Sequence, residues 1–175
     1  MAKPRKMLCN LEAEYTQTLM RLIETQSKIT LANWALDYAE AHYLPIYLKH
    51  YPDDNRTKVA IEAARDWLAG KVKLPAVKPL ILAAHEAARE AEAIPSAQAA
   101  ARAIGQAAST IHAATHSLGL AFYGAAAVAY ESFGTQADPD LYERIIEKEC
   151  GRITSALRAV AVANELNPAK IKWYC

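Results

Sequence analysis

With 175 residues, 53% of them hydrophobic, the chain is long enough to bury a core without a disulfide framework or a structural metal. Its 20 Lys and Arg nearly balance its 19 Asp and Glu, for a formal net charge of +1. This balance argues against nucleic-acid binding, which needs clustered basic residues. Neither a membrane-spanning apolar run nor a signal peptide is recognisable. We therefore expect a soluble, cytoplasmic protein.

The composition predicts the fold class. Alanine, the best helix former, makes up about a fifth of the residues, well above average usage. Val, Ile and Thr are too thinly spread to suggest a sheet. We predict an all-α fold, a compact bundle of about seven helices. An irregular stack of helix pairs is the alternative. We expect a single helical domain over 1–175, with tails at 1–9 and 167–175.

Helices in the first part of the chain are bounded by turn and capping residues. The first is predicted over 10–26, where apolar residues recur at steps of three and four. Thr30 is the expected N-cap of the second, and Pro45 should kink or restart it, because proline lacks a backbone donor. After a turn at 52–55, whose Asx residue caps it, the third helix ends at Gly70.

Prolines and glycines also mark the later helices. Two prolines bracket the start of the fourth helix, predicted over 75–92, and Pro95 opens the fifth. We expect a break within 112–117, followed by a sixth helix that ends at Gly134. An Asp-Pro-Asp start signal predicts a seventh helix over 138–166.

A histidine pair is the first candidate site. His112 and His116 are four residues apart, so on a continuous helix both would point to one side, as in a bis-histidine metal site. His85 is a possible third ligand. We favour histidines packed at a helix crossing, because functional zinc needs at least three converging ligands. A small residue before the pair, Gly105, would let another helix approach closely. We expect no metal and no cofactor.

A second candidate site combines carboxylates with an arginine. Asp37 and Glu40 lie one turn apart, near the edge of a stripe that contains Trp34, which we expect in the core. Arg56 falls on an otherwise apolar face of the third helix, and burying it unpaired would cost several kcal/mol. We therefore predict an Asp37–Arg56 or Glu40–Arg56 ion pair that joins two helices, rather than a catalytic role.

Two further features bear on function. The cysteines Cys9, Cys150 and Cys175 are odd in number and lack a CxxC spacing, which is typical of reduced thiols. The terminal aromatic pair Trp173 and Tyr174 either docks on the bundle or, if exposed, is a candidate partner contact. Without a phosphate-binding loop, a nucleophile elbow or a Cys–His signature, an enzyme is not the favoured reading.

Several segments together have a distinctive order and spacing. They are W-A-L-D-Y-A-E at 34–40, Y-P-D-D-N-R at 51–56, A-I-E-A-A-R-D-W at 60–67, A-A-H-E-A-A-R at 83–89 and the 112–116 histidine pair. Over about residues 30 to 130, this pattern resembles the helical immunity proteins of bacterial polymorphic toxin systems.

The resemblance implies a protein that binds a cognate toxin and neutralises it by protein–protein interaction, without catalysis. The alternatives are a metal-binding helical enzyme that uses the three histidines and a general helical scaffold protein with a conspicuous apolar patch. The oligomeric state stays open. The candidate partner- or ligand-binding residues, which could instead be scaffold, are Trp34, Asp37, Glu40, Arg56, His85, His112 and His116.

Overall fold

The computed structural model describes residues 4–173, and this part of the chain contains eight α-helices and no strand. The all-α prediction is confirmed. The helices are α1 (Glu14–Ile23), α2 (Lys28–His42), α3 (Leu44–His50), α4 (Arg56–Leu68), α5 (Leu74–Glu90), α6 (Pro95–Ser109), α7 (Ala125–Phe133) and α8 (Pro139–Val160). Three short elements connect them: 3-10 turns at Ala91–Ala93 and Ala114–Leu118, and a π-helical turn at Leu120–Gly124.

Two predicted helix starts are displaced along the chain. α1 begins at Glu14 rather than near Asn10, because Asn10 forms a turn in which its side chain accepts a hydrogen bond from the Glu12 backbone. The N-cap of α2 is Ser27, not Thr30. The Ser27 side chain accepts a hydrogen bond from the Thr30 backbone, so Thr30 lies inside the first turn that Ser27 caps.

Of two further predicted helix boundaries, the one at Pro45 is confirmed and the end of the last helix is wrong. Pro45 restarts the chain as the separate helix α3, as predicted. The prediction that the last helix reaches Leu166 is wrong, since α8 ends at Val160 and Ala161 is extended. Asn164 and Asn167 then adopt positive φ angles of 52° and 57°, which asparagine tolerates better than most residues and which a helix does not allow.

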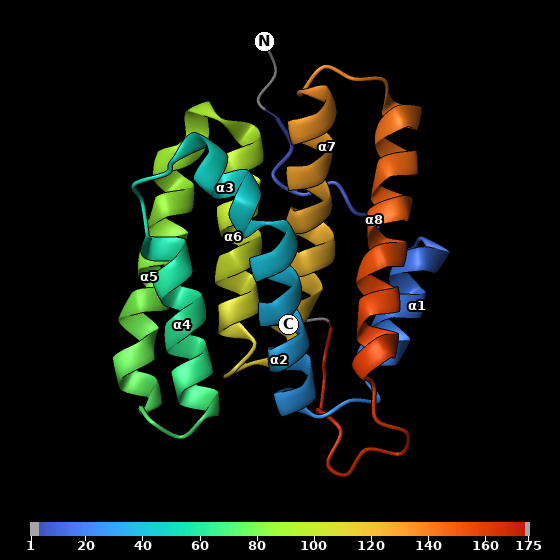
Figure 1. Cartoon of the computed structure of the whole chain (residues 1–175). Coiled ribbons are helices and arrows are strands. Elements are labelled where there is room, and N and C mark those ends of the chain that lie inside the picture. The colour runs from blue at the N-terminus through green and yellow to red at the C-terminus, as the bar shows by residue number, and fades with distance from the viewer. Residues whose placement is uncertain (1–3, 174–175) are drawn as a thin grey trace.

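The bundle is organised around α6, which packs against α2, α3, α4, α5 and α7 (Figure 1). Most of its alanines are fully buried, as is Gly105, and such small side chains let five neighbours approach one helix closely. α4 and α5 lie at one side of the bundle and α8, backed by α1, lies at the other. None of the helices in residues 4–173 combines the length and the apolar character needed to cross a bilayer.

A buried carboxylate joins α2 to α8. Glu149 is 3% exposed and accepts hydrogen bonds from the hydroxyls of Tyr38 (2.9 Å) and Tyr43 (3.0 Å). The Tyr43 ring lies against the π-helical turn, where a Cβ on Gly124 would come within 2.1 Å of the Tyr43 hydroxyl oxygen. Glycine is therefore required at 124 if Tyr43 is to reach Glu149.

The described residues near each terminus contact the helices. The Cys9 and Cys150 sulfurs lie 3.8 Å apart, although the two residues are distant in sequence. In the C-terminal segment, Trp173 donates a hydrogen bond from Nε1 to Glu24 at 2.6 Å, and Ala169 donates one from its backbone to Gln26. The Trp173 side chain thus docks on the bundle, whereas Tyr174 and Cys175 lie outside the described residues.

Candidate partner-binding site

Trp34 is part of the core. Its side chain, on α2, is only 3% exposed and belongs to the hydrophobic core. Its Nε1 has no hydrogen-bond partner among residues 4–173, so the indole serves here through its apolar area. As the sequence predicted, Trp34 belongs to the interior rather than to the surface that a partner could touch.

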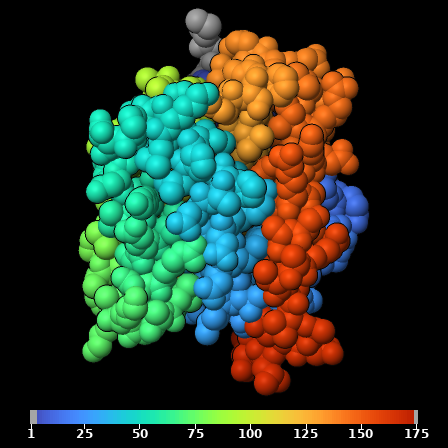
Figure 2. Space-filling view, viewed as in Figure 1, coloured from blue at the N-terminus to red at the C-terminus, as the bar shows by residue number. Residues whose placement is uncertain are grey.

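Asp37 and Glu40 lie on the exposed side of α2, and Figure 2 shows that α2 reaches the surface between α4 and α8. Their partner is Arg65 of α4. Its Nη2 lies 2.8 Å from Asp37 Oδ1 and 2.6 Å from Glu40 Oε2. The predicted pairing with Arg56 is therefore wrong, because Arg65 in the last turn of α4 takes these carboxylates and Arg56 binds Asp54 and Glu90 instead. The expected function of the pair, an ion bridge between two helices, is provided by Arg65.

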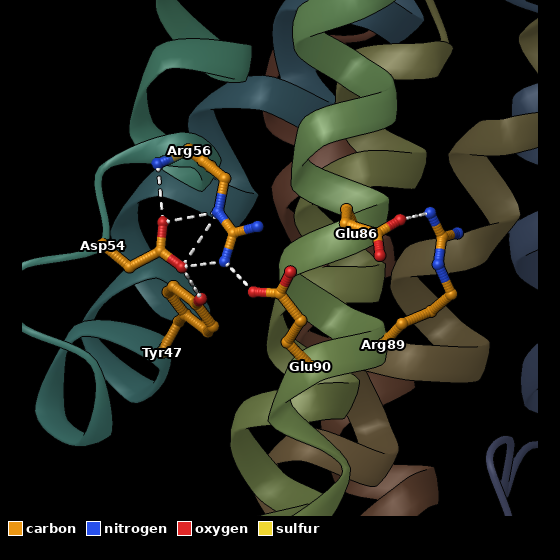
Figure 3. Close-up of polar contacts among 6 residues, drawn as sticks. All are labelled: Tyr47, Asp54, Arg56, Glu86, Arg89 and Glu90. Carbon is orange, nitrogen blue, oxygen red and sulfur yellow. Dashed lines mark hydrogen bonds and ion pairs between the residues drawn. The ribbon is translucent and has the colours of Figure 1, made fainter.

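Arg56 instead secures the turn that precedes α4 (Figure 3). Its guanidinium lies 2.6 Å from Asp54 Oδ2 and 2.5 Å from Glu90 Oε2 on α5, while the Tyr47 hydroxyl donates to Asp54 at 2.7 Å. The hydrogen bonds from the Arg56 side chain lower the pKa of Asp54 to about 2. Arg56 thus ties together α3, the turn and α5, which is a structural role.

The three histidines line one pocket of about 250 Å³, which we call the histidine pocket. α5 supplies one wall, the C-terminal end of α6 another, and the segment that follows α6 the third. The residues that line it are Lys78, Ile81, Leu82, His85, Ser109, His112 and His116. Neither Asp37 nor Glu40 is among them.

His112 and His116 do not lie on a continuous helix, contrary to the geometry assumed from their spacing. α6 ends at Ser109, a turn carries His112, and His116 lies in the 3-10 turn that follows. The two rings still meet edge to face, with centroids 5.2 Å apart. The expected break in the chain therefore lies close to the predicted position, and it places both imidazoles on the same pocket.

Helix α6 holds two of the three imidazoles in place. Gln106 Oε1 lies 2.6 Å from His116 Nδ1, so Nδ1 carries the proton of that hydrogen bond. The His85 ring crosses over Gly105, where a Cβ would lie 2.6 Å from His85 Cε1. The prediction that a small residue at 105 permits a close approach is correct, and the helix that approaches is α5.

The electrostatic surroundings of the pocket are cationic. Burial lowers the pKa of each of the three imidazoles. Nearby cations lower it further for two of them: Arg102 and Arg89 for His85, and Lys78 and Lys28 for His112. For His116 the further lowering is the mutual repulsion with His112 and His85 when these take up a proton. At neutral pH the imidazoles are therefore uncharged and can donate or accept hydrogen bonds. Among residues 4–173, no group of three or more His, Cys, Asp and Glu side chains is placed to hold a metal ion.

The sequence did not point to several residues of this region. The patterns identify neither Arg65 as the partner of Asp37 and Glu40 nor Lys78 and Leu82 as residues of a pocket. One signal was available: residues 71–85 contain three lysines and no acid, and Leu82 interrupts the exposed face of the helix. The contact between Gln106 and His116 had no sequence signal, because it depends on how the chain turns after α6.

The geometry defines an all-α protein with two groups of candidate residues. Trp34, Asp37, Glu40 and Arg56 have structural roles, and the three histidines line a pocket. A sequence model of the Imm-5 like putative immunity protein family matches residues 21–156. The chain belongs to this family. The match runs from within α1 to near the end of α8 and includes all seven candidate residues. No curated protein and no solved structure matches the chain.

Proposed function

We propose that this protein binds a cognate bacterial toxin in the cytoplasm and neutralises it by protein–protein interaction. The observation that carries the proposal is the family match over 21–156, which covers most of the helical bundle. Neutralisation by binding requires no catalytic group, only a surface with a few well-packed anchors. We further propose that the whole chain acts as one domain, because helices from both of its halves pack on α6.

The packing of the bundle supports a binding role. Alanine-lined contacts around α6 leave little room for rearrangement, so the outer faces of the helices are largely preformed. A preformed surface loses less conformational freedom on association, and this favours tight binding for a given interface area. Among the candidate residues, the buried Trp34 and the bridging Arg56 support this platform. The three histidines are the candidates that line a pocket.

The experiment pairs this chain with its genetic neighbours. Each neighbouring open reading frame is induced in a heterologous bacterial host, with or without co-expression of this chain. We expect one product to arrest growth, this chain to restore it, and the two purified proteins to elute as one complex from a sizing column. A variant that disrupts the fold, Gly124→Trp, is the control, because its side chain would displace Tyr43.

Two outcomes would count against the proposal. If no neighbouring product is both toxic and suppressed by this chain, a toxin-neutralising role has no support. If growth is restored without a complex, and the mass of the toxin changes after contact with this chain, then the protein is an enzyme that modifies the toxin. Intact-mass spectrometry of the toxin distinguishes this result from inhibition by binding.

A further inference from the structure

An exposed leucine stands beside the histidine pocket. Leu82 of α5 is 63% exposed, although Ile81 and Ala84 on either side of it are buried. It is one of the residues that line the pocket. Ile81, next to it, is buried and also lines the pocket. An exposed leucine next to a hollow offers a partner an apolar contact that the folded chain leaves unused.

The pocket beside this leucine is lined by a lysine and by no acid. Lys78 lines the pocket and makes no ion pair with any residue of 4–173, and Lys28 lies over the Trp67 ring at 5.9 Å. No carboxylate lines the pocket. The nearest acid along α5, Glu86, is paired with Arg89 (Figure 3). A complementary partner would therefore bring negative charge.

The size of the hollow bears on what occupies it. At about 250 Å³, it lies below the usual range of roughly 300–1,000 Å³ for pockets that enclose small organic ligands. A hollow of this size is better suited to a side chain of a partner than to a whole small molecule. Together with the exposed leucine beside it, this favours a protein surface as the occupant over a free metabolite.

We propose that the histidine pocket and Leu82 form the docking site for the cognate toxin, and that the docking segment of the toxin carries a carboxylate next to an apolar side chain. The apolar side chain packs on Leu82. The carboxylate faces Lys78 and accepts a hydrogen bond from the imidazole of His85 or His112, because His116 already donates its Nδ1 proton to Gln106. This inference rests on the proposed function and adds which surface binds the toxin and which chemistry it selects.

The test compares matched double variants. Lys78→Glu with Leu82→Asp alters the docking site, and Lys148→Glu with Leu166→Asp makes the same changes elsewhere. Lys148 is exposed on α8, at the opposite side of the bundle from α5, and Leu166 is 84% exposed beyond the end of α8. All four positions are exposed, so both variants should keep the circular dichroism spectrum and melting temperature of the parent protein.

The measured quantity is the dissociation constant for the toxin that the parent chain suppresses. We expect the docking-site variant to bind at least about 100-fold more weakly and to lose growth suppression, because it changes both an anchor and the complementary charge. The control variant should stay within about threefold of the parent. Raising salt from about 50 to about 500 mM should weaken the binding of the parent chain more than that of a Lys78→Glu single variant.

The outcomes separate this inference from the function on which it rests. If the parent chain suppresses and binds the toxin but the docking-site variant does so equally well, another surface binds the toxin and the docking site is refuted. If the parent neither suppresses nor binds a neighbouring product, the proposed function fails and the docking site fails with it. The site is also refuted if the substitutions abolish self-association of the chain, or binding to double-stranded DNA or phosphatidylglycerol vesicles, without affecting the toxin.

Discussion

Gly105 on α6 lies directly beneath the imidazole of His85 on α5, so close that a Cβ at 105 would stand 2.6 Å from Cε1 and 2.8 Å from Nδ1. The absence of a side chain at one position thus determines where a histidine of the pocket lies. Because the ring is half-buried, it cannot move aside without changing the shape of the pocket.

Replacing Gly105 by alanine tests this contact. In the middle of a helix, Gly→Ala normally gains about 0.5–1 kcal/mol. Here the added methyl group displaces His85, and we expect Gly105→Ala to lower the free energy of unfolding by about 1–2 kcal/mol instead. Urea denaturation measures the change. Gly151→Ala on α8 is the control, because no atom lies within 4 Å of its added Cβ, and it should stabilise the protein. Equal stabilisation by both substitutions would contradict the close contact.

The Glu149 cluster gives a second prediction. Glu149→Ala removes the acceptor for the hydroxyls of Tyr38 and Tyr43. The Tyr38 hydroxyl is then buried without a partner, and Tyr43 keeps only its longer hydrogen bond to the Leu120 carbonyl, at 3.3 Å. We expect a loss of about 2–4 kcal/mol in the free energy of unfolding, measured by thermal or chemical denaturation. Tyr15→Phe is the control. Its hydroxyl donates to Glu143 at the surface, so the cost should stay below about 1 kcal/mol. A similar small effect for both variants would show that Glu149 is not enclosed.

Acidification should destabilise the fold through the pocket histidines. In the unfolded chain they take up protons near their ordinary pKa of 6.5, whereas burial and repulsion from neighbouring basic groups lower the pKa of each in the folded state. As the pH falls through this value, the unfolded state therefore binds more protons than the folded state does. The stabilisation that the uncharged histidines give to the folded state is complete above pH 6.5 and is lost at lower pH. We expect the melting temperature to drop between about pH 7.5 and about pH 5.5.

A variant with all three pocket histidines replaced by glutamine should show a flatter profile over this range. The stabilisation from Asp54 and Glu131, whose pKa values are both lowered to about 2, is fully present over this range and is lost only at more acid pH, so it does not account for the change. If the variant loses stability on acidification as steeply as the parent protein, then the pocket histidines are not responsible.

The two arginines of α4 should differ in their contribution. Arg56 binds Asp54 through two guanidinium nitrogens, Nε and Nη2, and the Asp54 side chain is mostly shielded from water. Arg56→Ala should therefore lower the free energy of unfolding by about 1–2 kcal/mol. Arg65 bridges two exposed carboxylates, and Arg65→Ala should cost about 0–1 kcal/mol. Carboxyl NMR titration provides a second measurement. The pKa of Asp54, about 2 in the parent protein, should rise in Arg56→Ala and should be unchanged in Arg65→Ala. An unchanged pKa in Arg56→Ala would refute the pairing.

Local features of the sequence determined the fold class and most helix boundaries. Alanine content predicts helices, and residues such as Pro45, Pro95 and Gly70 mark where they begin and end, because each acts on backbone angles or hydrogen bonds within its own turn. The exceptions are also local. Asn10 and Asn164 lie in segments whose apolar spacing suggested a helix, but their side chains and backbone favour turns.

Only the tertiary structure decided which side chains meet. It paired Asp37 and Glu40 with Arg65 instead of Arg56, and it brought Cys9 to Cys150. It also placed His85 beside His112 and His116, although the last two are not on one helix. These contacts depend on how helices cross and on how closely alanine and glycine let them approach α6. Periodicity along a single helix contains no information about either quantity.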